Sequence, residues 1–233
     1  MEKTNIFKEK PLYTKQELDK MGFSWYQIRK LIEAGILKKL NSHVYESKIY
    51  TDVINDFNYV NVFIPDGVIC KLSASNYYGY TNFMPRSINV SISCDKKINK
   101  LPSYPQIDLS YPRGNRYSSG IVEINDGNNH FKIYSKEKTV CDILINRTKI
   151  DSEEIKNVLV GYLNDKERDL NKLYKLAIEL KCDKTLRTYM EVLLWDERYL
   201  YYEALMFTNK TLKTSICATD INSVFLFIIY KPI

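Results

Sequence analysis

The fold of the N-terminal part is decided by residues 14–39, which read TKQELDKMGFSWYQIRKLIEAGILKK. Two capping boxes stand in this stretch, one formed by Thr14 and Glu17 and the other by Ser24 and Gln27. In a capping box, each of the two side chains accepts a hydrogen bond from the backbone amide of the other residue, which satisfies the first turn of a helix. The stretch therefore predicts two short helices in close succession.

Each predicted helix has one apolar side and ends at a glycine. Gly22 and Gly35 stand where the helices end, and glycine adopts the left-handed conformation of a helix C-terminus at little steric cost. Ile28, Leu31 and Ile32 recur at helical spacing and form the inner side of the second helix. Two capped helices joined by a tight turn make a helix-turn-helix.

A short hairpin is expected directly after these helices. Residues 36–40 and 44–45 read as two strands around a turn at residues 41–43. A helix-turn-helix followed by such a hairpin is the winged form, in which the N-terminal end of the second helix meets base edges in the major groove of DNA. The sequence therefore predicts a winged helix-turn-helix DNA-binding domain over residues 1–48.

The charge distribution supports this hypothesis. Residues 1–48 hold ten Lys or Arg and six Asp or Glu, a surplus of four out of the chain's net charge of +6. A local basic surplus is typical of a surface that faces phosphates. The residues predicted to contact DNA lie on the second helix or on the hairpin: Ser24, Trp25, Gln27, Arg29, Lys30, Lys38, Lys39 and His43.

Some of these residues are expected to recognise bases and others to contact the sugar-phosphate backbone. Gln27 suits adenine and Arg29 suits guanine, because their side chains can make paired hydrogen bonds with those bases. Lys30 is placed for a phosphate, and the hairpin is expected to offer Lys38, Lys39 and His43 to the sugar-phosphate backbone. Trp25 has a second interpretation as a core residue at the helix start, and His43 has one as an ordinary turn residue.

The rest of the chain predicts an α+β fold, because strands come first and helices follow. Residues 49–66 show no clear period. Strands are expected at 68–72, 87–93, 106–111, 121–125 and 130–134, with a short helix at 73–78 and a hairpin formed by the last two strands. Longer helices are expected at 136–147, from a cap at Asp151 to Leu163, at 170–180 and at 186–194.

No catalytic or metal-binding motif stands out, so we expect no enzyme, no cofactor and no metal. The five Cys include no CxxC pair, and the two His give no zinc set and no catalytic pair, so mostly buried thiols are expected. Five acids could form a Mg²⁺ site, but helix caps and solvated helix faces explain them more simply: Glu137, Asp142, Asp151, Glu153 and Glu154.

No membrane partner is expected. The longest apolar run, Val224 to Tyr230, is far shorter than the roughly 20 residues that span a bilayer. The first residues, MEKTNIFKEK, lack the apolar stretch of a signal peptide, which favours a cytoplasmic location. Residues 195–233 form a C-terminal extension without an assigned role, and its apolar run is expected to be buried or paired.

Several stretches occur in an order that one family shares: Glu17 to Tyr45, Leu72-Ser73-Ala74, Lys132 to Asp142, and Arg187 to Leu194. Over residues 10–194 the chain resembles AbiEi-type antitoxins of type IV, abortive-infection toxin–antitoxin systems. The resemblance is strongest at residues 132–142. It departs at the hairpin turn, where the family has Arg-Gly and this chain has Ser42-His43, and it does not extend into residues 195–233.

The resemblance implies an antitoxin encoded in a two-gene operon that acts against phage. Its winged helix is expected to bind inverted repeats in double-stranded DNA of its own promoter and to repress transcription. Its α+β antitoxin domain, residues 49–194, is expected to oppose a cognate nucleotidyltransferase toxin without a stable complex. The resemblance also implies a monomer in solution that pairs on DNA.

Two other functions stay open on the sequence. The first is a protein-interaction module that uses the winged helix as a docking surface. The second is a metal-dependent nucleic-acid enzyme, which would depend on an acid such as Asp142.

Overall fold

The structure, a computed structural model, combines helices with two β-sheets, which confirms the α+β class. It describes residues 2–51, 55–98, 101–102, 104–126 and 129–193. The extension 195–233, with the apolar run that we expected to be buried or paired, lies outside the described residues. No helix in the described part is long and apolar enough to cross a membrane.

The described chain divides into two compact units. The first contains residues up to Ala74 together with Met84–Ser135, and the second contains Ser75–Phe83 and the described residues from Lys136 onward. The chain thus enters the second unit briefly after residue 74, returns to the first, and passes into the second again at residue 136.

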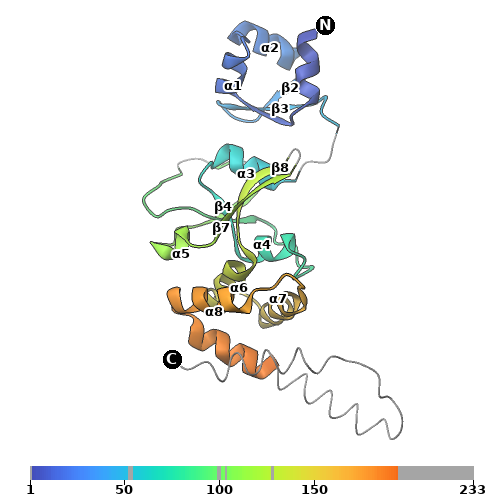
Figure 1. The fold of residues 1–233 in the computed structure, drawn as a ribbon. Helices are drawn as coiled ribbons and strands as arrows, with labels where there is room; N and C mark the ends of the chain where they lie inside the picture. The colour runs from blue at the N-terminus through green and yellow to red at the C-terminus, as the bar shows by residue number, and fades with distance from the viewer. Residues whose placement is uncertain (1, 52–54, 99–100, 103, 127–128, 194–233) are drawn as a thin grey trace, which may run out of the picture. The chain divides into compact units, whose positions relative to one another are not determined.

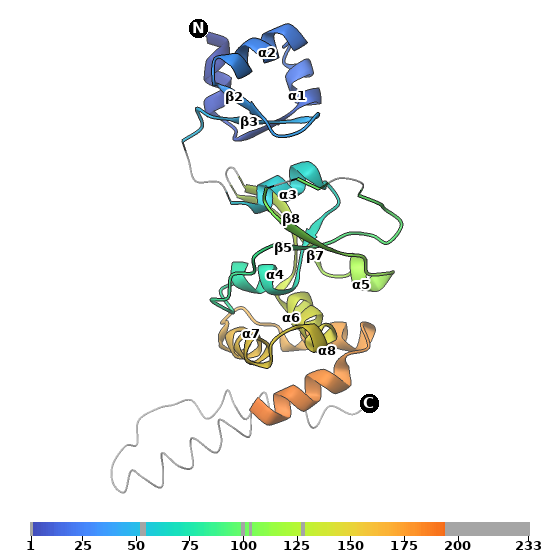
Figure 2. The ribbon, with the colours of Figure 1, turned by 180° about the vertical axis from the view of Figure 1, so that it is seen from behind.

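The N-terminal part of the first unit is built on a three-stranded antiparallel sheet in the order β1-β3-β2. Its elements are a 3-10 helix η1 (Glu2–Lys8), β1 (Leu12–Thr14), α1 (Lys15–Lys20), α2 (Trp25–Glu33), β2 (Leu37–Lys39) and β3 (Val44–Ser47). The three helical segments lie over one face of this sheet (Figures 1 and 2). The two helices and the hairpin were predicted; η1 and β1 were not.

Both predicted capping boxes are present. At the start of α1, Thr14 N donates to Glu17 Oε2 at 2.7 Å, and Glu17 N donates to Thr14 Oγ1 at 3.2 Å. At the start of α2, Ser24 N donates to Gln27 Oε1 at 2.8 Å, and Gln27 N donates to Ser24 Oγ at 3.4 Å. The local sequence signal therefore decides where both helices begin.

The core of this part forms between the helices and the sheet. Leu18, Phe23 and Ile28 are buried on the helical side. They cluster with Tyr13 and Tyr45 of the sheet, and Phe7 and Leu37 complete the cluster. The inner side of α2 is thus buried as predicted, although Leu31 and Ile32 are only partly covered.

The remainder of the first unit is a mixed five-stranded sheet in the order β6-β5-β4-β8-β7. Its strands are β4 (Val68–Ile69), β5 (Ile88–Ser91), β6 (Ile107–Ser110), β7 (Ile121–Asp126) and β8 (Asn129–Tyr134). The β4–β8 and β5–β6 pairs are parallel, while β4–β5 and the predicted β7–β8 hairpin are antiparallel.

Helix α3 (Phe57–Phe63) was missed by the sequence analysis, which found no clear period there. It contacts β8, where the rings of Phe57 and Phe131 lie 5.3 Å apart edge to face. Two other short helices, α4 (Lys71–Tyr77) and α5 (Asn115–Ser118), complete the elements before the last hairpin.

The second unit is helical. It contains α6 (Lys136–Ile145), the 3-10 turn η2 (Arg147–Lys149), α7 (Ser152–Asn164), α8 (Leu170–Glu179) and a further helix over residues 183–193. All four long helices were predicted. Three of the four cysteines in the described part are buried, as expected: Cys70, Cys141 and Cys182.

Helix α6 corrects the expectation that its acids are solvated. Lys138 has no exposed surface and pairs with Asp142, which is also buried. Glu137 is buried as well, and its Oε2 lies 2.7 Å from Nζ of Lys172 on α8. A carboxylate can be buried when a cation and hydrogen bonds compensate the loss of water, and α6 meets this condition inside the unit.

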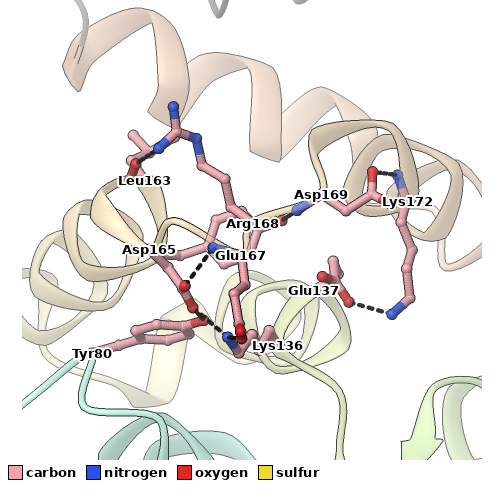
Figure 3. A network of polar contacts seen from close by, with 10 residues as sticks. Tyr80, Lys136, Glu137, Leu163, Asp165, Glu167, Arg168, Asp169 and Lys172 are labelled. Carbon is pink, nitrogen blue, oxygen red and sulfur yellow. Dashed lines mark hydrogen bonds and ion pairs between the residues drawn. The ribbon is translucent and has the colours of Figure 1, made fainter. Parts of the chain in front are cut away.

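A polar network joins α6 to the segment between α7 and α8 (Figure 3). Lys136 Nζ lies 2.8 Å from Asp165 Oδ2 and 2.7 Å from Glu167 Oε2. The Tyr80 hydroxyl donates to Asp165 Oδ2 at 2.7 Å. The hydrogen bonds from Lys136 and from Tyr80 hold the pKa of Asp165 at about 2, because they stabilise the carboxylate.

Gly161 allows α7 to approach the chain at Tyr80. A Cβ added at Gly161 would lie 2.7 Å from Tyr80 Cα and 2.9 Å from its carbonyl oxygen. Both atoms belong to the backbone, so the contact cannot be relieved by rotating a side chain.

The Gly161→Ala substitution tests this contact. We expect it to lower the free energy of unfolding by about 1–3 kcal/mol, as overpacking usually does, although Ala favours a helix over Gly. Urea unfolding followed by circular dichroism measures the change. Asn157→Ala, at an exposed position of α7, is the control and should have a much smaller effect. A more stable Gly161→Ala variant would contradict the close approach.

The Asp165→Asn substitution tests the network through its pH dependence. Because the folded pKa lies below the value of about 3.9 in an unfolded chain, the charged Asp165 stabilises the fold at neutral pH. That contribution is lost as the pH falls from about 5 to about 2. The stability gap between wild type and variant should therefore close over this range. Glu167→Gln, whose side chain is 82% exposed, should show little effect at any pH. A gap that stays constant with pH would be the contrary result.

Candidate nucleic-acid interface

All eight residues predicted to contact DNA are exposed in the structure: Ser24, Trp25, Gln27, Arg29, Lys30, Lys38, Lys39 and His43. Ile28 of α2 is fully buried against the sheet, whereas Trp25, Gln27, Arg29 and Lys30 are exposed around the rest of the helix. The hairpin β2–β3 supplies the remaining three, two from β2 and one from its turn. The helix therefore exposes a polar and cationic face to solvent.

Trp25 and Lys39 bring the start of α2 and the hairpin together. Nζ of Lys39 lies 5.5 Å from the centre of the Trp25 ring, within the range of a cation–π interaction. Trp25 is 56% exposed, so its alternative interpretation as a core residue is wrong. The helix start and the hairpin thus form one continuous surface through this pair.

The two lysines of β2 do not share a face of the sheet. Lys39 stands opposite Tyr45, whose side chain is buried beneath the helices, whereas Lys38 stands opposite Glu46. Successive strand residues point to opposite faces, and directly paired residues point to the same face. Lys39 therefore belongs to the α2 side, and Lys38 lies on the other side with an acidic neighbour.

The two predicted base readers already have partners. Gln27 Oε1 accepts the Ser24 amide of the capping box, so only the amide nitrogen of Gln27 is free to donate. Arg29 Nε donates to Glu33 Oε1 at 2.9 Å, and both side chains are well exposed. An exposed pair of this kind contributes only about 0.3–0.5 kcal/mol, so DNA can displace it, whereas a bidentate contact of Gln27 with adenine competes with the helix cap.

Tyr26 belongs to the same surface and was missed by the sequence analysis. It is 65% exposed, and Nζ of Lys30 lies 4.7 Å from the centre of its ring. The sequence did contain a sign of this pair, since Tyr26 lies one helical turn before Lys30 near the N-terminus of α2. The surface is therefore more aromatic than its charge pattern indicated.

The hairpin turn closes without a glycine. The side-chain oxygen of Asn41 accepts hydrogen bonds from His43 N at 2.7 Å and from Val44 N at 2.8 Å. Among the described residues other than glycine, a positive φ occurs only at Lys71 and Lys181. His43 therefore needs no left-handed backbone, and the Ser42-His43 turn forms a tight hairpin by means of the Asn41 side chain.

The acids considered for a metal have separate structural partners. Asp151 accepts from Glu153 N at the start of α7, and Glu154 bonds to Thr81. In the described ranges, no group of three or more His, Cys, Asp or Glu side chains is arranged to hold a metal ion.

The surface formed by α2 and β2 thus combines exposed cations with exposed aromatic rings. Sequence comparison finds no protein-family model that matches this chain and no curated protein that is similar to it.

Proposed function

We propose that this chain is a DNA-binding antitoxin and autorepressor, whose residues 1–48 act as a winged helix on its own promoter. The order of elements supports the winged-helix assignment: a helical turn, a strand, two helices and a hairpin, with β1 added beside β3. The proposed partner is double-stranded DNA of the promoter, and the proposed location is the cytoplasm.

One observation carries the proposal: α2 buries its apolar side and exposes a cationic side that continues onto the hairpin. Ile28 is fully buried while Arg29, Lys30 and Lys39 are exposed. Exposed lysines and arginines on a recognition helix and its wing neutralise phosphates and release counterions, which supplies most of the affinity for DNA.

The antitoxin role is supported by the resemblance to AbiEi-type antitoxins over residues 10–194. The strongest part of that resemblance, residues 132–142, forms the junction between β8 and α6, where Lys138 and Asp142 are buried as a pair. Because these residues are buried, this stretch supports a fold shared with the family more than a binding surface shared with it. Opposition to a nucleotidyltransferase toxin is therefore assigned to residues 49–194 as a whole.

The Lys30→Ala/Lys39→Ala double variant tests DNA binding. Each lost phosphate contact should make the slope of log affinity against log salt shallower by about 0.9, so the double variant should lose about 1.8. The measurement is a titration of duplex DNA from upstream of the gene, over several salt concentrations. Lys166→Ala/Lys175→Ala removes the same charge from exposed positions of the second unit and should leave the slope unchanged.

A second comparison sharpens this test, because Lys38 and Lys39 are neighbours on opposite faces of β2. Lys39→Ala should weaken binding more than Lys38→Ala. Equal slopes in wild type and the Lys30/Lys39 double variant, or binding without any sequence preference, would speak for a protein-docking module instead.

The same double variant separates repression from antitoxicity. In cells that carry the neighbouring toxin gene and a reporter behind the operon's promoter, we expect the variant to release the reporter and still to protect growth. Growth rate and reporter signal are read in one culture, with the wild-type chain and an empty vector as references. Loss of protection together with repression, at equal protein level, would contradict the assignment of toxin opposition to residues 49–194.

A further inference from the structure

We propose that Trp25 and Tyr26 contact thymine 5-methyl groups in the major groove, so that the interface prefers thymine beneath the start of α2. The inference rests on the proposed DNA binding and specifies which base chemistry the surface reads. The sequence analysis predicted that Trp25 contacts DNA, but it assigned base recognition to Gln27 and Arg29.

The first observation is the position of the two rings. Trp25 and Tyr26 occupy the first two positions of α2, directly after its N-cap Ser24. They are 56% and 65% exposed, although the adjacent Ile28 is fully buried. In helix-turn-helix proteins it is this N-terminal end of the second helix that reaches base edges.

The second observation is that the polar readers nearby are engaged. The carbonyl oxygen of the Gln27 side chain is held by Ser24 N, and Nε of Arg29 is held by Glu33. The first three positions of α2 therefore offer two exposed rings and one amide whose oxygen is already held, while Arg29, whose pair with Glu33 DNA can displace, lies further along the helix. The thymine methyl is the apolar group that base pairs present in the major groove, and apolar side chains read it.

The third observation is the charge around the rings, which favours a nucleic acid over an apolar protein surface. Lys39 lies over the Trp25 ring at 5.5 Å and Lys30 over the Tyr26 ring at 4.7 Å. The single acid of α2 is Glu33, at the far end of the helix. Each ring is thus flanked by a cation that can reach a phosphate while the ring faces the base edges.

The test uses the full chain and a duplex that it selects itself. Wild-type protein first enriches duplexes from a random-sequence library, and the enriched duplex is then made with thymine and, separately, with deoxyuridine, which lacks the methyl group. Dissociation constants of both duplexes are measured for wild type, Trp25→Ala and Tyr26→Ala. Phe83→Ala, which removes an exposed aromatic side chain of the second unit, is the matched control.

We expect wild type to bind the deoxyuridine duplex about fourfold more weakly for each methyl contacted, from the transfer free energy of one buried methyl-sized group. The Trp25 and Tyr26 variants should bind the thymine duplex more weakly than wild type and should discriminate less between the two duplexes. The Phe83 variant should behave as wild type on both.

Two results overturn the inference while leaving the proposed function intact. One is equal binding of the two duplexes by wild type. The other is a discrimination that persists undiminished in both aromatic variants, which would mean that the methyl groups act through the shape of the DNA. Failure to enrich any duplex would instead overturn the proposed DNA binding, and this inference with it.

Discussion

The N-terminal part depends on the packing of two short helices against a pair of sheet tyrosines. Leu18, Phe23 and Ile28 bury their side chains on Tyr13 and Tyr45, and this contact sets the rotation of α2 about its own axis. Once Ile28 points inward, Tyr26 and Lys30 must point outward, since residues two positions away from it on a helix of 3.6 residues per turn lie on the opposite side. The exposure of this aromatic and cationic pair is therefore a consequence of the core.

The helical second unit follows a different principle, in which charges are buried as partners. Lys138 pairs with Asp142 within α6, and Glu137 of α6 pairs with Lys172 of α8, whose side chain is half exposed. Removal of Asp142 or Lys172 would leave a buried charge with fewer partners, which costs more than loss of an exposed ion pair. Glu137, Lys138 and Asp142 are thus among the residues that the fold constrains most strongly.

Local signals proved sufficient for the starts of α1 and α2 and for the hairpins. Both capping boxes formed as their residues indicated, and the turn residues at 126–129 predicted the β7–β8 hairpin. Helix α3 and strand β1 escaped prediction because neither shows a period of its own. Phe57 is held by a ring on β8, and β1 is held by its pairing with β3, which lies about 30 residues further along the chain.

By itself the sequence determined where α1 and α2 begin and end, because a cap or a glycine acts over about four residues. Tertiary structure decided which of those residues can meet a partner. It placed Lys38 and Lys39 on opposite faces through pairing with β3, exposed Trp25, and buried Glu137 and Lys138. The burial of a side chain and the face to which it points depend on contacts between residues far apart in the chain. Such contacts cannot be inferred from a single local stretch of sequence.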